Sequence, residues 1–156
     1  MNLYLDASAI VKRFVVEAGS AEVGQVVAGA RLAGTALISR AEVAAALARA
    51  VRMQALKAKA AAQLLQAFRD HWANLVRLPI TEAVVTRADA LAWEHGLRGY
   101  DAVHLAAALT WQEALGLPVV LATFDQQLWE TAGQVGLVAY PEDLRALLSR
   151  PRRRRA

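Results

Sequence analysis

Short apolar runs alternate along the chain with longer segments in which apolar residues recur every three or four positions. The short runs predict strands at residues 3–5, 35–38, 75–78, 119–123 and 136–140. The longer segments predict helices at 7–16, 20–30, from Ser39 onward, 56–72, 82–95, 101–115, 126–132 and after 143. Strands that alternate with helices predict parallel strands joined by right-handed crossovers. The expected fold class is therefore α/β, a three-layer α/β/α sandwich with a mostly parallel sheet of about five strands.

Composition narrows the class of protein. The chain has 156 residues, of which 56% are hydrophobic and 21% charged, as expected for one globular domain. We predict this domain at 1–149 and a basic tail at 150–156. Cysteine is absent, which excludes disulfides and a Cys nucleophile and fits a cytoplasmic protein. Charged residues interrupt the N-terminal apolar stretch, and neither a signal peptide nor a membrane span is expected.

Charge is unevenly distributed. The net charge is +4, and five arginines, Arg150 and Arg152 to Arg155, lie in the tail. Between residues 40 and 59 there are five basic residues, and Glu42 is the one acidic residue. Between residues 82 and 143, most of the charged residues are acidic. A basic stripe beside an acidic site suits a polyanionic substrate that needs a metal ion, although ordinary solvated helix faces give the same pattern.

Four carboxylates occupy the same kind of position. Asp6 and Asp125 follow strands, and Glu42 and Asp101 lie in the first turns of helices. The carboxyl ends of parallel strands meet at one edge of the sheet, so these acids are expected to converge. Oxygen ligands without Cys or a His cluster favour Mg²⁺, with Mn²⁺ as the second choice. The pattern predicts a metal-dependent phosphodiesterase.

Structural explanations exist for each of these acids taken alone. Asp6 and Asp125 are suitable helix N-caps, and acids are generally favoured at helix N-termini. Ser39-x-x-Glu42 fits a capping box, in which Glu42 would bond only to the backbone of Ser39. His104 follows Asp101 by three residues, and helix packing is its expected role.

Four stretches in order, 5–12, 39–43, 100–108 and 122–128, resemble the PIN domain, specifically the toxin nucleases of VapBC-type toxin–antitoxin pairs. The resemblance covers nearly the whole chain except the tail. It implies a magnesium-dependent endoribonuclease that hydrolyses RNA with metal-activated water. Asp6 and Asp101 would be the principal metal ligands, and Glu42 and Asp125 would complete the acidic pocket.

The resemblance also implies supporting residues and partners. Ser8 and Thr123 would support the pocket through hydrogen bonds to Asp6 or to a phosphate. A homodimer is expected, neutralised by a cognate antitoxin that places a basic side chain in the pocket. From their charge, the candidate contacts for RNA phosphates are Arg40, Arg49 and Arg52.

Two other functions remain open at this point. The first is a non-catalytic PIN-like module that binds RNA or protein, which the capping explanations favour. The second is a phosphatase on a doubly wound sheet. It is disfavoured because the segment Asp6-Ala7-Ser8 lacks the second Asp that a dehalogenase-type phosphatase uses.

Overall fold

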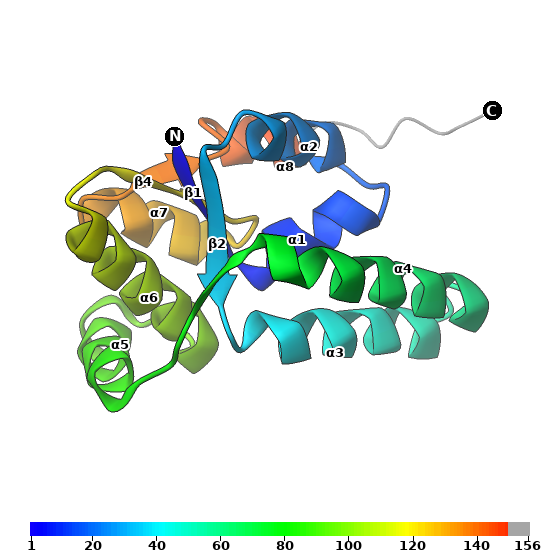
Figure 1. Cartoon of the computed structure of the whole chain (residues 1–156), viewed down its shortest axis with the longest axis horizontal. Coiled ribbons are helices and arrows are strands. Elements are labelled where there is room, and N and C mark those ends of the chain that lie inside the picture. The colour runs from blue at the N-terminus through cyan, green and yellow to red at the C-terminus, as the bar shows by residue number, and fades with distance from the viewer. Residues whose placement is uncertain (150–156) are drawn as a thin grey trace.

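Five parallel strands form one sheet at the centre of the computed structural model, which describes residues 1–149 (Figure 1). The strands are β1 (Asn2–Leu5), β2 (Leu32–Ala36), β3 (Val76–Leu78), β4 (Val119–Ala122) and β5 (Val138–Tyr140). Their order is β3-β2-β1-β4-β5, and every neighbouring pair is parallel. The predicted parallel sheet is confirmed, with β1 in the middle.

Helices cover both faces of this sheet. They are α1 (Ala7–Phe14), α2 (Ser20–Ala28), α3 (Ser39–Arg52), α4 (Ala58–His71), α5 (Glu82–His95), α6 (Gly99–Leu115), α7 (Gln126–Gln134) and α8 (Leu144–Ser149). One apolar core packs α1 to α4 against the sheet, and a second packs α5 to α7 against it. In Figure 1, α5 and α6 lie on the left and α3 and α4 on the right. The three-layer sandwich is confirmed.

The central strand β1 contributes side chains to both cores. Leu3 and Leu5 belong to the core under α1 to α4, and Tyr4 belongs to the core under α5 to α7. Successive side chains of a strand point to opposite faces, so an uninterrupted apolar run is required when both faces are covered. The strand ends where Asp6 replaces an apolar residue.

A close approach between β2 and α6 positions the longest helix. Gly34 lies in β2, and a Cβ atom there would come within 3.0 Å of the Trp111 ring. The absent side chain lets the buried indole of α6 pack directly on the strand. This contact helps to orient α6, whose first turn carries Asp101.

Several predicted boundaries shift. The strand predicted at 35–38 spans Leu32–Ala36, because its register with β1 pairs Asn2 with Leu32. The helix predicted at 56–72 begins at Ala58 and gives way to a 3₁₀ turn at Trp72–Asn74, and the first helix ends at Phe14. The remaining ends move by about three residues or fewer, as is common where helix ends fray.

Ser39 does not cap its helix, and this prediction is wrong. Ile38 holds the cap position in a helical conformation without a side-chain bond, and Ser39 is the first residue of α3. The Ser39 hydroxyl is buried and forms a 2.6 Å hydrogen bond with the hydroxyl of Thr35. Only a short turn separates β2 from α3, and the Ser39 hydroxyl links the helix to the strand instead of capping the helix.

Within residues 1–149, none of the helices combines the length and apolar character needed to cross a membrane. The predicted tail at 150–156 lies outside the described residues.

Candidate active site

Four acidic side chains meet in one open cleft at the carboxyl edge of the sheet. Asp6 follows β1 and Asp125 follows β4, and these two strands are neighbours at the point where the strand order reverses. Glu42 comes from α3 and Asp101 from α6, on opposite faces of the sheet. The predicted convergence is therefore found, at the position where doubly wound sheets bind ligands.

Asp6 is the most deeply buried of the four acids, with only 4% of its surface exposed. Its Oδ1 accepts the backbone N–H of Ala9 at 2.8 Å, so it does cap α1 as well as face the cleft. Ser8 Oγ donates to the same carboxylate at 2.7 Å, and Thr123 Oγ1 donates at 2.7 Å. Burial raises the pKa of Asp6 above its ordinary value, although the nearby His104 and these donors oppose the rise.

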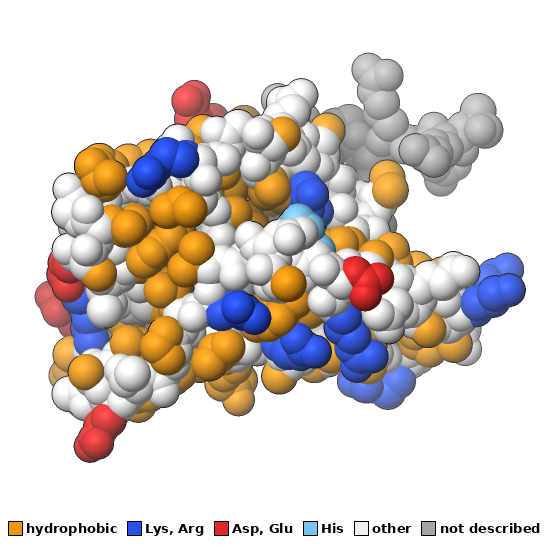
Figure 2. Space-filling view, viewed as in Figure 1, with side chains coloured by type: hydrophobic (Ala, Val, Ile, Leu, Met, Phe, Trp, Pro, Cys, Tyr) orange, Lys and Arg blue, Asp and Glu red, His pale blue; other side chains and the backbone are white. Residues whose placement is uncertain are grey.

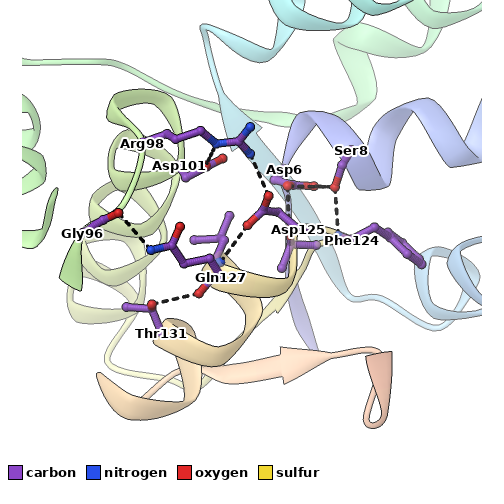
Figure 3. Close-up of polar contacts among 11 residues, drawn as sticks. Asp6, Ser8, Gly96, Arg98, Asp101, Phe124, Asp125, Gln127 and Thr131 are labelled. Carbon is purple, nitrogen blue, oxygen red and sulfur yellow. Dashed lines mark hydrogen bonds and ion pairs between the residues drawn. The ribbon is translucent and has the colours of Figure 1, made fainter. Parts of the chain in front are cut away.

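The hydroxyls of Thr123 and Ser8 join the ends of β1 and β4, and Figure 3 shows the contacts of Ser8 with Asp6 and Phe124. Thr123 Oγ1 donates to Asp6 and accepts the backbone N–H of Asp125 at 3.1 Å. Ser8 Oγ donates to Asp6 and accepts the backbone N–H of Phe124 at 2.9 Å. Each hydroxyl thus joins the Asp6 carboxylate to the loop after β4. The supporting contacts expected of Ser8 and Thr123 toward Asp6 are present.

Glu42 reaches into the cleft and not back to its own helix. Its Oε2 lies 2.7 Å from Nε2 of His104, and Tyr4 Oη lies 2.9 Å from the other ring nitrogen, Nδ1. The capping-box explanation for Glu42 is therefore wrong. His104 is 2% exposed and packs its helix as expected, but its link to Glu42 was missed. The spacing of Asp101 and His104 hinted at a shared face, but nothing in the sequence pairs His104 with residue 42.

The charge on His104 follows from this setting. Burial lowers the pKa of His104, but the hydrogen bond to Glu42 and the negative charges of Asp6, Glu42 and Asp101 outweigh this effect and raise the pKa. The raised pKa favours the protonated form of this buried imidazole, whose charge would offset part of the negative charge in the cleft.

Asp101 and Asp125 share one cation, the Arg98 guanidinium (Figure 3). Nε donates to Asp101 Oδ2 at 2.8 Å, and Nη2 donates to Asp125 Oδ2 at 2.7 Å. Burial raises the pKa of Asp101, the bond from Arg98 lowers it, and the charge of Asp125 raises it further, so that the result is a raised pKa. Asp125 also caps α7, because its Oδ1 accepts the backbone N–H of Leu128 at 2.9 Å. Asp125 thus caps its helix and lines the cleft at the same time.

The predicted RNA-binding arginines separate in space. Arg49 lines the acidic cleft, together with the buried Lys12, whose Nζ lies 2.9 Å from Glu17. Arg40 instead lies over the ring of Trp72, 5.5 Å from its centroid, and lines a different hollow between α3 and α4. Arg52 is in the last turn of α3 and is not among the residues that line the cleft. Figure 2 shows Lys and Arg side chains gathered over α3 and α4.

The sequence model of the PIN domain matches residues 3–134. The chain belongs to the PIN domain family. Ribonuclease VapC45 of Mycobacterium tuberculosis is 37% identical over 143 residues, which cover 91% of this chain and 96% of that protein. The relationship to VapC proteins that the sequence suggested is thus confirmed.

Solved structures show the same fold at lower identity. PAE2754 from Pyrobaculum aerophilum has a TM-score of 0.63 and 21% identity, and the match covers 96% of this chain and 91% of that one. A toxin–antitoxin complex from Klebsiella pneumoniae has a TM-score of 0.55 and 18% identity, with 80% and 88% covered. The PIN-like architecture is therefore shared well beyond the reach of sequence similarity.

The cleft of this PIN domain has the donor chemistry that a divalent ion needs. All four acids offer hard carboxylate oxygens, and a guanidinium already bridges two of them. In the part of the chain that the structure describes, no three Asp, Glu or His side chains lie close enough to form a complete set of metal ligands. The residues fit Mg²⁺ or Mn²⁺ by chemistry, and closing the ligand set requires side-chain movement.

Proposed function

We propose that this PIN domain protein is a magnesium-dependent endoribonuclease and the toxin of a toxin–antitoxin pair. One observation carries the proposal, namely that Asp6, Glu42, Asp101 and Asp125 line the same cleft although they come from four separate elements. The relative VapC45, which is named a ribonuclease, supports RNA as the substrate. Action on RNA in the cytoplasm is part of the proposal.

The four acids have distinct tasks in this proposal. Asp6 and Asp101 would be the principal ligands of Mg²⁺, or of Mn²⁺ in its place, with Glu42 and Asp125 completing the site directly or through water. When bound, the ion supplies Lewis-acid stabilisation of phosphate charge and lowers the pKa of water. Three donors hold Asp6 in one orientation, and a carboxylate has acceptor capacity left beyond three bonds.

Positive side chains around the acids would bind the substrate. Arg49 lines the cleft and is exposed, so it is accessible to an RNA phosphate. Arg40 and Arg52 lie on the same helix, α3, and would extend the contact along the RNA backbone away from the cleft. Because backbone contacts carry no sequence information directly, these arginines are expected to set affinity and not the choice of RNA.

Cleavage of total RNA by the purified full chain tests the function. Wild-type protein is expected to cut RNA with Mg²⁺ or Mn²⁺, and EDTA should abolish cleavage. Asp6→Asn and Asp101→Asn should each remove the activity, whereas Asp70→Asn should not, because Asp70 is an exposed acid on α4 outside the cleft. Expression should arrest growth for wild type and Asp70→Asn only, and co-expression of the cognate antitoxin should relieve the arrest.

The binding-module hypothesis makes the opposite forecast. It expects RNA or protein binding that is indifferent to metal, with no cleavage. Equal cleavage by wild type and both cleft variants, or cleavage that survives EDTA, would refute the proposed nuclease site.

A homodimer forms part of the proposal, and an apolar surface on α5 and α6 supports it. Val85, Ala92, Tyr100 and Val103 line a hollow between the two helices, and Trp93 beside it is 92% exposed. Exposed apolar patches of this kind are typical of protein interfaces. Val85→Arg should convert the dimer to a monomer in light scattering. A wild-type chain that is monomeric at all concentrations would contradict this assignment.

A further inference from the structure

The guanidinium of Arg98 occupies the space between two carboxylates that the proposed function assigns to the metal. Its Nε donates to Asp101 at 2.8 Å and its Nη2 donates to Asp125 at 2.7 Å (Figure 3). These acids come from different elements, the first turn of α6 and the cap of α7. Two nitrogens of one planar guanidinium thus bind the two carboxylates that a single divalent ion would bind.

Exposure differs sharply between the cation and its partners. The Arg98 side chain is 73% exposed, while those of Asp101 and Asp125 are 14% and 27% exposed. An exposed arginine gains little from such a pair and loses little on leaving it. The half-buried carboxylates, in contrast, gain more from a neighbouring cation, because water screens their charge less. The arrangement therefore permits exchange of one cation for another.

We propose that Arg98 is a substrate-binding residue that changes partners. It neutralises the charge of Asp101 and Asp125 until a divalent ion replaces it, and it then binds an RNA phosphate beside the cleft. This inference rests on the proposed function. Arginine suits the second task, because its fork matches the oxygens of a phosphate as it matches those of carboxylates. Lys12 cannot exchange in this way as readily, since it is buried and paired with Glu17.

Exchange predicts opposite effects of one substitution on two ligands. Removing the guanidinium takes away the competitor of the metal, so Arg98→Gln should bind Mn²⁺ about fivefold more tightly in the absence of RNA. The same variant should bind RNA about tenfold more weakly when a divalent ion is present. With EDTA, Arg98 stays on the carboxylates, so its loss should change RNA affinity less than about twofold.

The control is Arg87→Gln. Like Arg98, Arg87 donates to carboxylate oxygens, with 2.7 Å bonds from α5 to both oxygens of Glu113 on α6. It does not line the acidic cleft. It should leave Mn²⁺ and RNA affinities at wild-type values. Arg98→Lys keeps the charge without the fork and should fall between wild type and Arg98→Gln in both measurements.

Mn²⁺ affinity is measured by electron paramagnetic resonance titration of the full chain, and folding of each variant is checked by circular dichroism. RNA affinity is measured by fluorescence anisotropy of a short labelled single-stranded RNA at constant salt. Ca²⁺ serves as the divalent ion, and a gel verifies that the RNA stays intact. Tighter Mn²⁺ binding together with a metal-dependent loss of RNA affinity would support the exchange.

Two results would overturn the inference alone. They are unchanged Mn²⁺ affinity in Arg98→Gln, and a loss of RNA affinity that is the same with Ca²⁺ and EDTA. A wild-type chain that binds no Mn²⁺ would instead overturn the proposed function, and this inference with it.

Discussion

Replacing Thr123 by valine tests whether one buried hydroxyl holds the cleft together. Thr123 is fully buried, and valine has nearly the same shape, so the substitution leaves no cavity. It removes the 2.7 Å bond to the Asp6 carboxylate, which is worth about 1.5–3 kcal/mol as a charge-assisted bond. It also leaves the backbone N–H of Asp125 without its 3.1 Å acceptor, at a cost of about 1 kcal/mol.

The expected loss of unfolding free energy is therefore about 3 kcal/mol, equivalent to a Tm lower by about 6–12 °C for a chain of this size. RNA cleavage should fall by about 10–100-fold, because groups that orient a metal ligand typically matter to this extent.

Urea unfolding in EDTA measures the loss, with equal m-values confirming that the same surface is exposed on unfolding. The matched control is Thr110→Val, because Thr110 is an exposed threonine of α6. Its unfolding free energy should stay within about 0.5 kcal/mol of wild type. If Thr123→Val is as stable as Thr110→Val, the hydroxyl does not hold Asp6 and the reasoning fails.

Three further predictions concern the surroundings of the cleft. Gly19→Ala should destabilise the protein by about 2 kcal/mol or more in urea, because Gly19 has φ +91° and a Cβ there would lie 2.4 Å from the Phe124 ring. Gly24→Ala, in the open interior of α2, should instead leave stability unchanged or raise it by up to about 1 kcal/mol, and equal losses in both would contradict this. Without metal, the unfolding free energy should fall as the pH rises above 6.5 and through the raised pKa of His104, because the folded state holds the His104 proton more tightly than the unfolded chain does. His104→Gln should flatten the dependence of Tm on pH across this range, and an unchanged slope would refute the assignment. Tyr4→Phe should cost about 1 kcal/mol by removing the 2.9 Å bond to His104, and a wild-type unfolding curve would show that this bond is not stabilising.

The fold was predictable because burial on two faces leaves a clear sequence pattern. The uninterrupted apolar run at residues 3–5 fits a strand that is covered on both faces, and it ends where Asp6 begins. The start of β2 was not predictable in the same way. Leu32 and Ala33 are half-buried, and only pairing with β1 makes them part of the strand. Strand pairing joins segments that are far apart in the sequence, and the local pattern of apolar residues does not reveal it.

The acids that line the cleft were predictable for a related reason. A parallel sheet brings the ends of its strands to one edge, so the position of each acid within its element was enough to predict convergence. Their exact partners were not predictable. Glu42 fitted a local capping box equally well. Only the meeting of α3 and α6 at the carboxyl edge of the sheet, from its opposite faces, brings it to His104, 62 residues further along.

The sequence by itself determined the succession of strands and helices along the chain, the parallel sheet and the position of four acids at element ends. Each of these follows from patterns within a few residues of the chain. The tertiary structure alone decided that the His104 ring meets Glu42 and that Arg98 spans Asp101 and Asp125. Those pairings are set by how neighbouring elements pack, and hydrogen bonds of a few ångströms depend on that packing and not on spacing along the sequence.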